Sequence, residues 1–225
     1  MKETDRIREY FGRTLWRASA GRAYLVEERV SLLRSAVNLL ATPTRGLSVC
    51  DVGCGTGHDL RTWRDAGVPG ASLAGTELVP ERAAAARAAL PQADIRAVDG
   101  FDLPFATDTF DLCSASLVLS TIIQAEHRRR LLMEMARVTA PGGIVVVYDF
   151  VISKPWNREV RRITARSLQD AWRRPDRVLS AAPLLPALDA MSHLPRSVSR
   201  RLIPLLPRTH RVWLWRVPAL SEQED

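Results

Sequence analysis

The chain has 225 residues, 46% of them hydrophobic, so it is long enough to bury a full core as a single domain. Its 32 basic and 25 acidic residues give a net charge of +7. No apolar run reaches the roughly 18 residues that cross a bilayer, and the charged start is unlike a signal peptide. We therefore expect a soluble, cytoplasmic protein with no membrane association.

The excess positive charge lies in the last third of the chain. Residues 1–150 hold 18 basic and 18 acidic side chains, and residues 151–225 hold 14 and 7. This imbalance would suit an acidic substrate, but the arginines are spread over many turns, which favours solvated helix faces. The three cysteines have no metal-ligand spacing and are expected to be structural thiols, so no metal site is predicted.

Two helices and a strand precede a glycine-rich stretch. Hydrophobic spacing predicts a helix over residues 4–20, an interruption at Gly21 and a second helix over residues 24–40. A turn at residues 42–46 leads into a buried strand over residues 47–52. Glycines at 53, 55 and 57 then allow a tight turn and let a ligand approach the backbone. Strand, turn and helix in this order form the ligand-binding corner of a doubly wound sheet.

The rest of the chain alternates between strands and helices, which predicts a parallel sheet covered on both faces. Strands are expected at residues 72–76, 94–98, 109–116 and 144–148, and helices at 58–66, 80–90 and 124–140. The tail should add a helix at 161–172, a weak strand at 177–180, a helix at 197–206 and a last strand at 210–217. On that strand Trp213 and Trp215 face the same side and should cover a helix.

Glu77 closes the second predicted strand about 20 residues after the glycines, where a carboxylate can accept hydrogen bonds from a ribose. A dinucleotide-binding pattern would place Gly or Ala at position 58, and this chain has His58 there. Four ordered signals instead resemble the class I S-adenosylmethionine (SAM) dependent methyltransferases. They are Asp51-x-Gly53-x-Gly55-x-Gly57, Asp99-Gly100, Leu103-Pro104-Phe105 with Phe110-Asp111, and Glu134–Val138 running into Pro141-Gly142-Gly143.

The resemblance covers residues 47–148 and implies an α/β fold: a Rossmann-like, doubly wound, mostly parallel seven-stranded sheet with helices on both faces. It implies SAM as cofactor and S-adenosylhomocysteine as product. In such enzymes Asp99 would accept from the adenine amino group and Phe101 would lie against the ring. The cofactor-binding residues are then expected to be Asp51, Gly53, Cys54, Gly55, Thr56, Gly57, Glu77, Leu78, Asp99, Gly100, Phe101 and Ser116.

The tail narrows the resemblance. Tyr148-Asp149-Phe150, Ala182-Pro183-Leu184-Leu185-Pro186 and residues 208–215 are similar to small bacterial methyltransferases of polysaccharide and secondary-metabolite pathways. Three domain parts follow: a helical lid at 1–46, a SAM-binding core at 47–150, and residues 151–225, which complete the sheet and shape the substrate pocket. Candidate catalytic groups are Tyr148, Asp149 and His58, unless proximity alone suffices. Candidate substrate contacts are Tyr10, Tyr24, Tyr148, Trp156 and Asn157.

The expected reaction is methyl transfer to a small molecule, with a hydroxyl of a sugar or specialised metabolite as the first hypothesis. Nitrogen or carbon acceptors stay open, as does a SAM-binding cyclase or non-methylating homologue, because a fold does not determine chemistry. Nucleic acid is a less favoured substrate: Ser114 to Ser120 stand where adenine methyltransferases carry Asn/Asp-Pro-Pro-Tyr/Phe, and the basic tail lacks interleaved aromatics. A monomer or a homodimer is equally compatible with the sequence.

Overall fold

The computed structural model describes residues 2–13, 20–37, 43–152, 157–183 and 185–218. Its strands are β1 (Val49–Val52), β2 (Leu73–Glu77), β3 (Asp94–Ala97), β4 (Phe110–Ser116), β5 (Thr139–Phe150), β6 (Arg177–Pro183) and β7 (Arg208–Arg216). Its α-helices are α1 (Glu3–Arg13), α2 (Ala20–Val37), α3 (His58–Asp65), α4 (Pro80–Ala89), α5 (Ala125–Val138), α6 (Ala165–Ala171), α7 (Leu185–Met191) and α8 (Arg196–Leu202).

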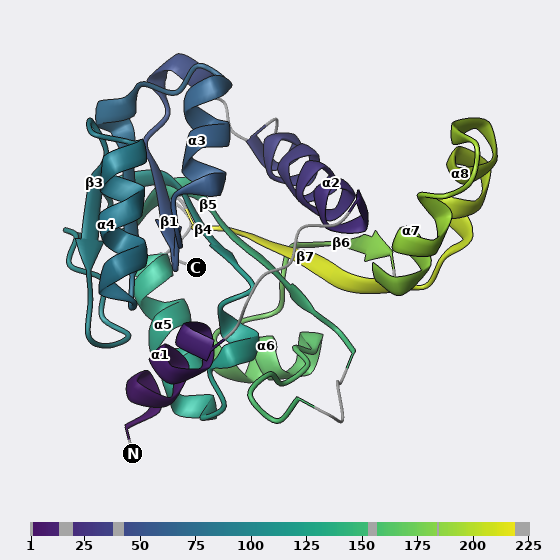
Figure 1. The fold of residues 1–225 in the computed structure, drawn as a ribbon. Coiled ribbons are helices and arrows are strands. Elements are labelled where there is room, and N and C mark those ends of the chain that lie inside the picture. The colour runs from purple at the N-terminus through teal and green to yellow at the C-terminus, as the bar shows by residue number, and fades with distance from the viewer. Residues whose placement is uncertain (1, 14–19, 38–42, 153–156, 184, 219–225) are drawn as a thin grey trace.

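The strands form one seven-stranded sheet in the order β3-β2-β1-β4-β5-β7-β6, with helices on both faces (Figure 1). Strands β1 to β5 are parallel, and β7 runs antiparallel to both β5 and β6. The expected fold class is confirmed. Because β2 and β4 lie on opposite sides of β1, the chain reverses direction across the sheet there, and a crevice opens at the carboxyl ends of these strands.

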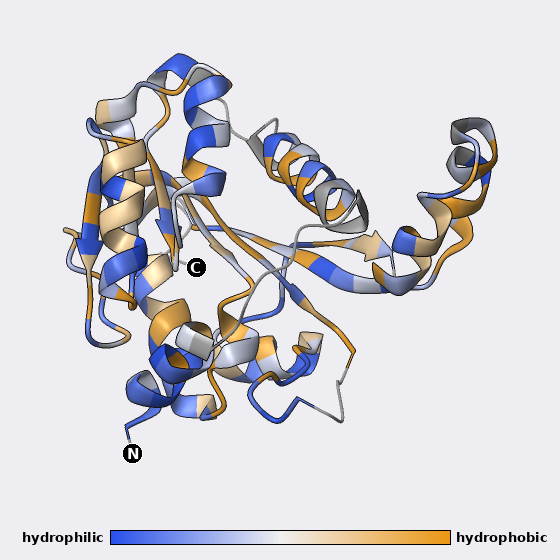
Figure 2. Cartoon of the chain, in the orientation of Figure 1, coloured by the Kyte–Doolittle hydropathy of each residue, from blue (hydrophilic) through white to orange (hydrophobic). Residues whose placement is uncertain are grey.

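Alternating side chains of each central strand serve two separate cores. In β5, Val145 and Val147 point to the core that contains α5 and α6, whereas Ile144 and Val146 point to the core that contains α3 and α4. All four are buried because both sheet faces are covered, which is why the strand reads as a continuous apolar run. Figure 2 shows the same pattern, with hydrophobic strands inside and hydrophilic outer helix faces.

The tail of the sheet confirms the expectation for the two tryptophans. Trp213 and Trp215 belong to the core on the α5 and α6 face. The ring of Trp215 lies 5.6 Å from that of Trp172 at the end of α6, and its Nε1 donates to the carbonyl of Arg173 at 3.0 Å. The weak strand expected at residues 177–180 extends to Pro183, and its first four residues are exposed.

Two local predictions were wrong. Gly21 lies inside α2 and does not interrupt it. Pro141-Gly142-Gly143 is not a turn before β5 but part of it, as a bulge where the pairing moves from Phe110–Thr139 to Leu112–Ile144. Gly143 is required there, since a Cβ would lie 2.7 Å from the carbonyl oxygen of Ala140. Across the described residues, no helix combines the length and the apolar content needed to span a bilayer.

Candidate functional site

A cavity of about 730 Å³ opens at the carboxyl ends of β1, β2, β4 and β5. Residues 53–56 of the glycine turn (residues 53–57) line one wall, and α1 and α2 contribute Phe11, Leu25 and Arg29. The tail adds residues of α7 and the start of β7. The cavity is therefore built from segments that lie far apart in the chain and meet at the reversal point of the sheet.

The glycine turn depends on backbone conformations that other residues avoid. Gly53, Gly55 and Gly57 have φ angles of 68°, 59° and 80°, in the left-handed region that glycine alone adopts without strain. The amide of Cys54 donates to the carbonyl of Thr76 on β2 at 2.9 Å, which fixes the turn to the next strand. Gly53 to Thr56 line the cavity, whereas Gly57 is the residue before α3 and does not.

Glu77 joins the end of β2 to the glycine turn. Its side chain is almost fully buried, one carboxylate oxygen accepts from the amide of Gly55 at 2.8 Å, and the other accepts from the amide of Val79 at 2.9 Å. The guanidinium of Arg82 lies 3.9 Å away. Each carboxylate oxygen has two acceptor positions, so Glu77 keeps capacity for donors in the cavity that it lines.

A second carboxylate lies below the glycine turn. Asp51 is buried, lines the cavity and accepts from the hydroxyl of Ser114 at 2.9 Å. Burial, followed by the neighbouring charge of Asp59, raises the pKa of Asp51 well above its usual range. Asp59 itself is paired with Arg29 of α2 at 2.7 Å. Asp51 is thus a buried acid that a cation in the cavity would stabilise in its ionised form.

The other end of the cavity holds an aromatic stack. The ring of Tyr148 lies 5.0 Å from that of His210 at an angle of 13°, and both residues are buried. His210 Nδ1 is 2.8 Å from the Thr209 hydroxyl oxygen. Burial raises the pKa of Tyr148, although the nearby Arg29 acts in the opposite direction. Tyr148 is therefore a neutral phenol near pH 7 and acts as a hydrogen-bond donor or acceptor.

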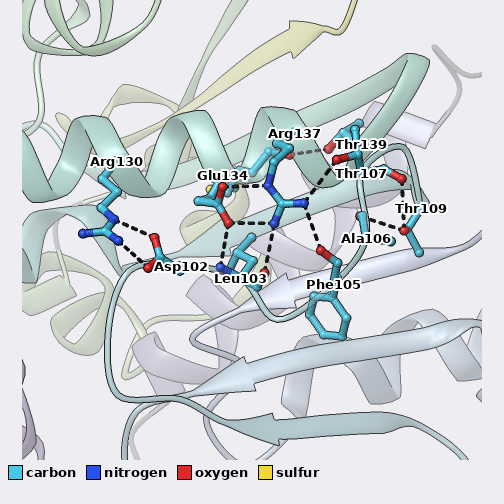
Figure 3. A network of polar contacts seen from close by, with 11 residues as sticks. Asp102, Leu103, Phe105, Ala106, Thr107, Thr109, Arg130, Glu134, Arg137 and Thr139 are labelled. Atoms are coloured by element: carbon cyan, nitrogen blue, oxygen red, sulfur yellow. Dashed lines mark hydrogen bonds and ion pairs between the residues drawn. The ribbon is translucent and has the colours of Figure 1, made fainter.

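The loop after β3 is held on α5 by the contacts in Figure 3. Arg137 donates to the carbonyl oxygens of Leu103 and Phe105 at 3.0 Å each, and Glu134 accepts from the amide of Leu103 at 2.9 Å. The Glu134–Arg137 pair lowers the pKa of Glu134. This network fixes the loop whose preceding residues reach the cavity, among them Phe101, which stacks on the ring of His127.

The structure brings most of the predicted cofactor residues to the cavity. Those that line it are Asp51, Gly53, Cys54, Gly55, Thr56, Glu77, Leu78, Gly100, Phe101 and Ser116. The Oγ of Ser116 is buried and has no hydrogen-bond partner among the described residues. Asp99 does not line the cavity: its side chain is 68% exposed and is paired with Arg8 of α1 at 2.7 Å, which lowers the pKa of Asp99.

The candidate catalytic and substrate residues divide in the same way. Tyr148, His58 and Tyr10 line the cavity, and Asn157, which does not line it, donates to the Tyr10 hydroxyl at 3.3 Å. Desolvation lowers the pKa of His58. Tyr24 does not line the cavity, and Trp156 lies outside the described residues.

Asp149 does not line the cavity. Its fully buried carboxylate accepts from the amides of Ser120 and Phe150 at 2.8 Å each, which fastens the end of β5 to the loop after β4. Burial raises the pKa of Asp149 to about 6. This geometry favours a positioning role over the role of a base in contact with a ligand.

Sequence reasoning missed two cations in the cavity, Arg29 and Arg82. Arg29 reaches from α2 to Asp59 and lies 5.7 Å from the ring centre of Tyr148. Arg82 lies 4.7 Å from the ring centre of Phe11 and so close to the glycine turn that a Cβ on Gly55 would be 2.5 Å from it. Nothing in the sequence distinguishes them from the other helix arginines, because their distinguishing contacts are long-range.

Comparisons with known proteins agree with this geometry. Residues 50–147 match the methyltransferase domain family model. Malonyl-acyl-carrier-protein O-methyltransferase of Pectobacterium atrosepticum is 32% identical over 121 residues, 50% of this chain and 45% of that protein. The chain thus spans about half the length of the curated relatives it matches.

Two solved structures are similar in fold. Geranyl diphosphate C-methyltransferase from Streptomyces coelicolor A3(2), in complex with Mg²⁺, geranyl diphosphate and S-adenosyl-L-homocysteine, superposes with a TM-score of 0.68 at 14% identity, covering 96% of this chain and 98% of that one. The cyclase SpnF superposes with a TM-score of 0.60 at 20% identity, covering 84% and 82%. At these identities the likeness concerns the fold alone.

Proposed function

Because the chain belongs to the class I SAM-dependent methyltransferases, we propose that it transfers the methyl group of SAM to a small molecule held in the cavity. The observation that carries the proposal is the junction of Glu77 with the glycine turn. It places a buried carboxylate and a glycine turn on two adjacent strand ends, where a nucleoside is recognised by its ribose and by backbone approach.

The residues present suit SAM. Glu77 would accept from the ribose hydroxyls with its remaining lone pairs, and Phe101 would lie against the adenine. The acidic group at Asp51 would favour the positive charges of the methionine end, whose ammonium and sulfonium groups compensate a buried carboxylate. Arg29 would hold the methionine carboxylate, since its buried Nε has no partner among the described residues. Bound SAM supplies an electrophilic methyl group.

The chain's own residues then position the acceptor and exclude water. In-line transfer requires the acceptor atom to lie about 3 Å from the methyl carbon, and positioning alone supplies much of the rate. The acceptor end of the cavity is lined by apolar side chains, including Leu25, Phe150 and Ile152, and by the polar Tyr148. We infer an acceptor with an apolar body and one polar group that Tyr148 orients.

A hydroxyl or carboxyl acceptor is the first choice within this class. A hydroxyl must lose its proton, and His58, whose lowered pKa keeps it neutral near pH 7, is the candidate base. The sugar or specialised-metabolite hydroxyl expected from the sequence falls within this choice, and the apolar lining favours acceptors with a hydrophobic part. A neutral amine would attack through its lone pair and release its proton to solvent afterwards, so it would need no base at His58, whereas a carbon acceptor would need a group that takes the proton it loses.

The test has two stages. Calorimetry with SAM and with S-adenosylhomocysteine should show binding that is lost in Gly55→Val, whose branched side chain would meet Arg82 and would also strain the turn. Incubation with radiolabelled SAM and fractionated small-molecule extracts should then give labelled product and S-adenosylhomocysteine. Binding of SAM without S-adenosylhomocysteine in any fraction would favour a cyclase or a non-methylating homologue, and no binding would refute the cofactor site.

A further inference from the structure

Residues 185–207, here called the arm, connect β6 to β7 and comprise α7, α8 and the short 3-10 helix Ile203–Leu205. Figure 1 shows the arm standing off the sheet at the far end of the β6–β7 hairpin, with α8 at its outer end. Ser199 of α8 donates through its hydroxyl to the carbonyl of Met191 at 2.9 Å, so the arm is folded back on itself. The arm contributes no strand to the sheet.

The outer face of the arm is apolar. Leu194, Val198, Leu202 and Leu205 are 42%, 41%, 36% and 78% exposed, and they are four of the seven large apolar side chains exposed among the described residues. Val198, Leu202 and Leu205 are four and three residues apart along α8 and the following 3-10 helix, which places them along one side, and Leu194 stands just before the extended Pro195 at the start of α8; the four are here called the stripe. A surface helix ordinarily turns such a stripe toward the core, and Figure 2 shows hydrophobic residues along the outer part of the arm.

The arm carries a net positive charge. Residues 185–207 contain three arginines and one histidine against a single aspartate, Asp189, and three more arginines follow in β7. Arg208 is paired with Glu28 of α2 at 2.9 Å, so part of this charge is used inside the molecule. Arg196, Arg200 and Arg201 belong to α8 itself, and Arg201 is exposed. Exposed apolar side chains and three arginines therefore share one short segment of the arm.

We propose that the arm docks on the surface of an anionic phospholipid bilayer. The stripe would enter the boundary between headgroups and acyl chains, and the arginines would meet the anionic headgroups, as basic amphipathic helices do. Docking of this kind needs no spanning helix. The sequence argument against membrane association considered only spanning segments and a signal peptide, so it did not test this arrangement.

The observations favour a bilayer over other occupants. RNA would be attracted by the arginines, but residues 185–207 contain no Phe, Tyr or Trp for bases to stack on, and RNA would leave the stripe exposed. A second copy of the chain would cover the stripe but would bring two sets of arginines together. Of these three occupants, an anionic bilayer is the one that would both bury the stripe and attract the arginines.

The arm also borders the cavity. Leu185 and Pro186, at the start of α7, line the cavity, and α7 leads directly to the stripe. If the proposed function holds, docking would place the acceptor end next to the bilayer, and an apolar acceptor would reach it from the lipid phase. The docking itself does not depend on methyl transfer.

The test is co-sedimentation of the full chain with vesicles of phosphatidylcholine alone and of phosphatidylcholine mixed equally with phosphatidylglycerol. Binding should be confined to the mixed vesicles and should fall steeply as salt rises. Leu205→Ser should weaken it about ten-fold or more, since one exposed leucine loses its burial. Arg201→Gln should weaken it about five-fold through the lost headgroup attraction.

The matched controls lie on the body of the molecule. Met133→Ser on α5 and Arg64→Gln on α3 remove an exposed apolar and an exposed basic side chain and should leave vesicle binding unchanged. SAM affinity should be unaffected in Leu205→Ser, which separates this test from that of the cofactor site. Equal binding to both vesicle types, equal losses in the controls, preferential binding to single-stranded RNA, or light scattering that shows a dimer dissociated by Leu205→Ser would each overturn the proposal.

Discussion

Glu77 gives the sharpest test of the site because its carboxylate has a structural role as well as a proposed role in cofactor binding. Its carboxylate accepts from two backbone amides, of Gly55 and Val79. Glu77→Ala leaves both donors without a partner, and a buried unpaired donor costs about 1–3 kcal/mol. Two such donors would cost about 2–6 kcal/mol together, and because water in the cavity can reach Gly55, which lines it, we expect the lower part of that range, about 2–4 kcal/mol of unfolding free energy.

The assay is urea denaturation without ligand, followed by tryptophan fluorescence, for which the buried Trp63 of α3 is a reporter near the turn. Glu77→Gln keeps one carbonyl oxygen and should recover about half of the loss. Glu126→Ala is the control, because Glu126 is 77% exposed and its ion pair with Arg129 is worth at most about 1 kcal/mol.

Cofactor affinity is measured on the same variants. Glu77→Ala should weaken SAM binding by about 1–3 kcal/mol beyond its effect on folding, because the ribose loses a charged acceptor. An unchanged unfolding free energy in Glu77→Ala would show that the two amides do not depend on this carboxylate. An unchanged SAM affinity would remove Glu77 from the cofactor site and leave it only a structural role.

Three further predictions concern buried groups. Because folding raises the pKa of Asp149 to about 6, the folded chain binds more protons than the unfolded chain between roughly pH 4 and 6. The unfolding free energy measured by urea denaturation should therefore fall by up to about 3 kcal/mol as pH rises through that interval. Asp149→Asn should abolish this pH dependence. Gly53→Ala should lower the unfolding free energy by about 1–3 kcal/mol, because the new Cβ would lie 2.6 Å from a methyl of Val118 and the backbone has a φ of 68°. Adding Val118→Ala should relieve the clash but not the backbone strain, so stability should return only in part. Full recovery of stability would exclude backbone strain. Arg29→Met should cost about 3–5 kcal/mol by leaving Asp59 buried and unpaired, and Asp59→Asn in the same chain should restore most of it; additive losses would contradict a coupled pair.

The elements predicted best are those whose signals are local. The glycine turn was located because only glycine tolerates its three positive φ values, and the central strands because both sheet faces are covered. β6 gave a weak signal because its first four residues are exposed at the sheet edge and therefore need no apolar alternation. Gly21 was misread because a glycine costs a helix only about 1 kcal/mol, which packing can offset.

The site was predictable only in part, because some of its residues are recognised by local patterns and others only by contacts that are remote in the sequence. Glu77 follows a buried strand at a recognisable distance from the glycines, and the structure places it against the turn. Asp99 satisfies the same kind of pattern, yet its side chain is directed to Arg8, 91 residues earlier in the chain. No short-range pattern reveals such a partner, and whether Asp99 contacts adenine stays a prediction. The cavity cations Arg29 and Arg82 escaped notice because Asp59, which pairs with Arg29, and Phe11, which lies against Arg82, are remote in the sequence.

The two ends of the cavity are therefore encoded differently. The cofactor end follows from contiguous motifs between residues 47 and 148. The proposed acceptor end is lined by residues of both the N-terminal helices and the tail, and these segments contact each other through pairs such as Asn157 with Tyr10 and Arg208 with Glu28. Since neither segment forms that wall alone, a change of acceptor requires both to change together. Exchanging only one of them with a related methyltransferase should lower acceptor turnover and leave SAM affinity intact, whereas exchanging both should transfer the preference.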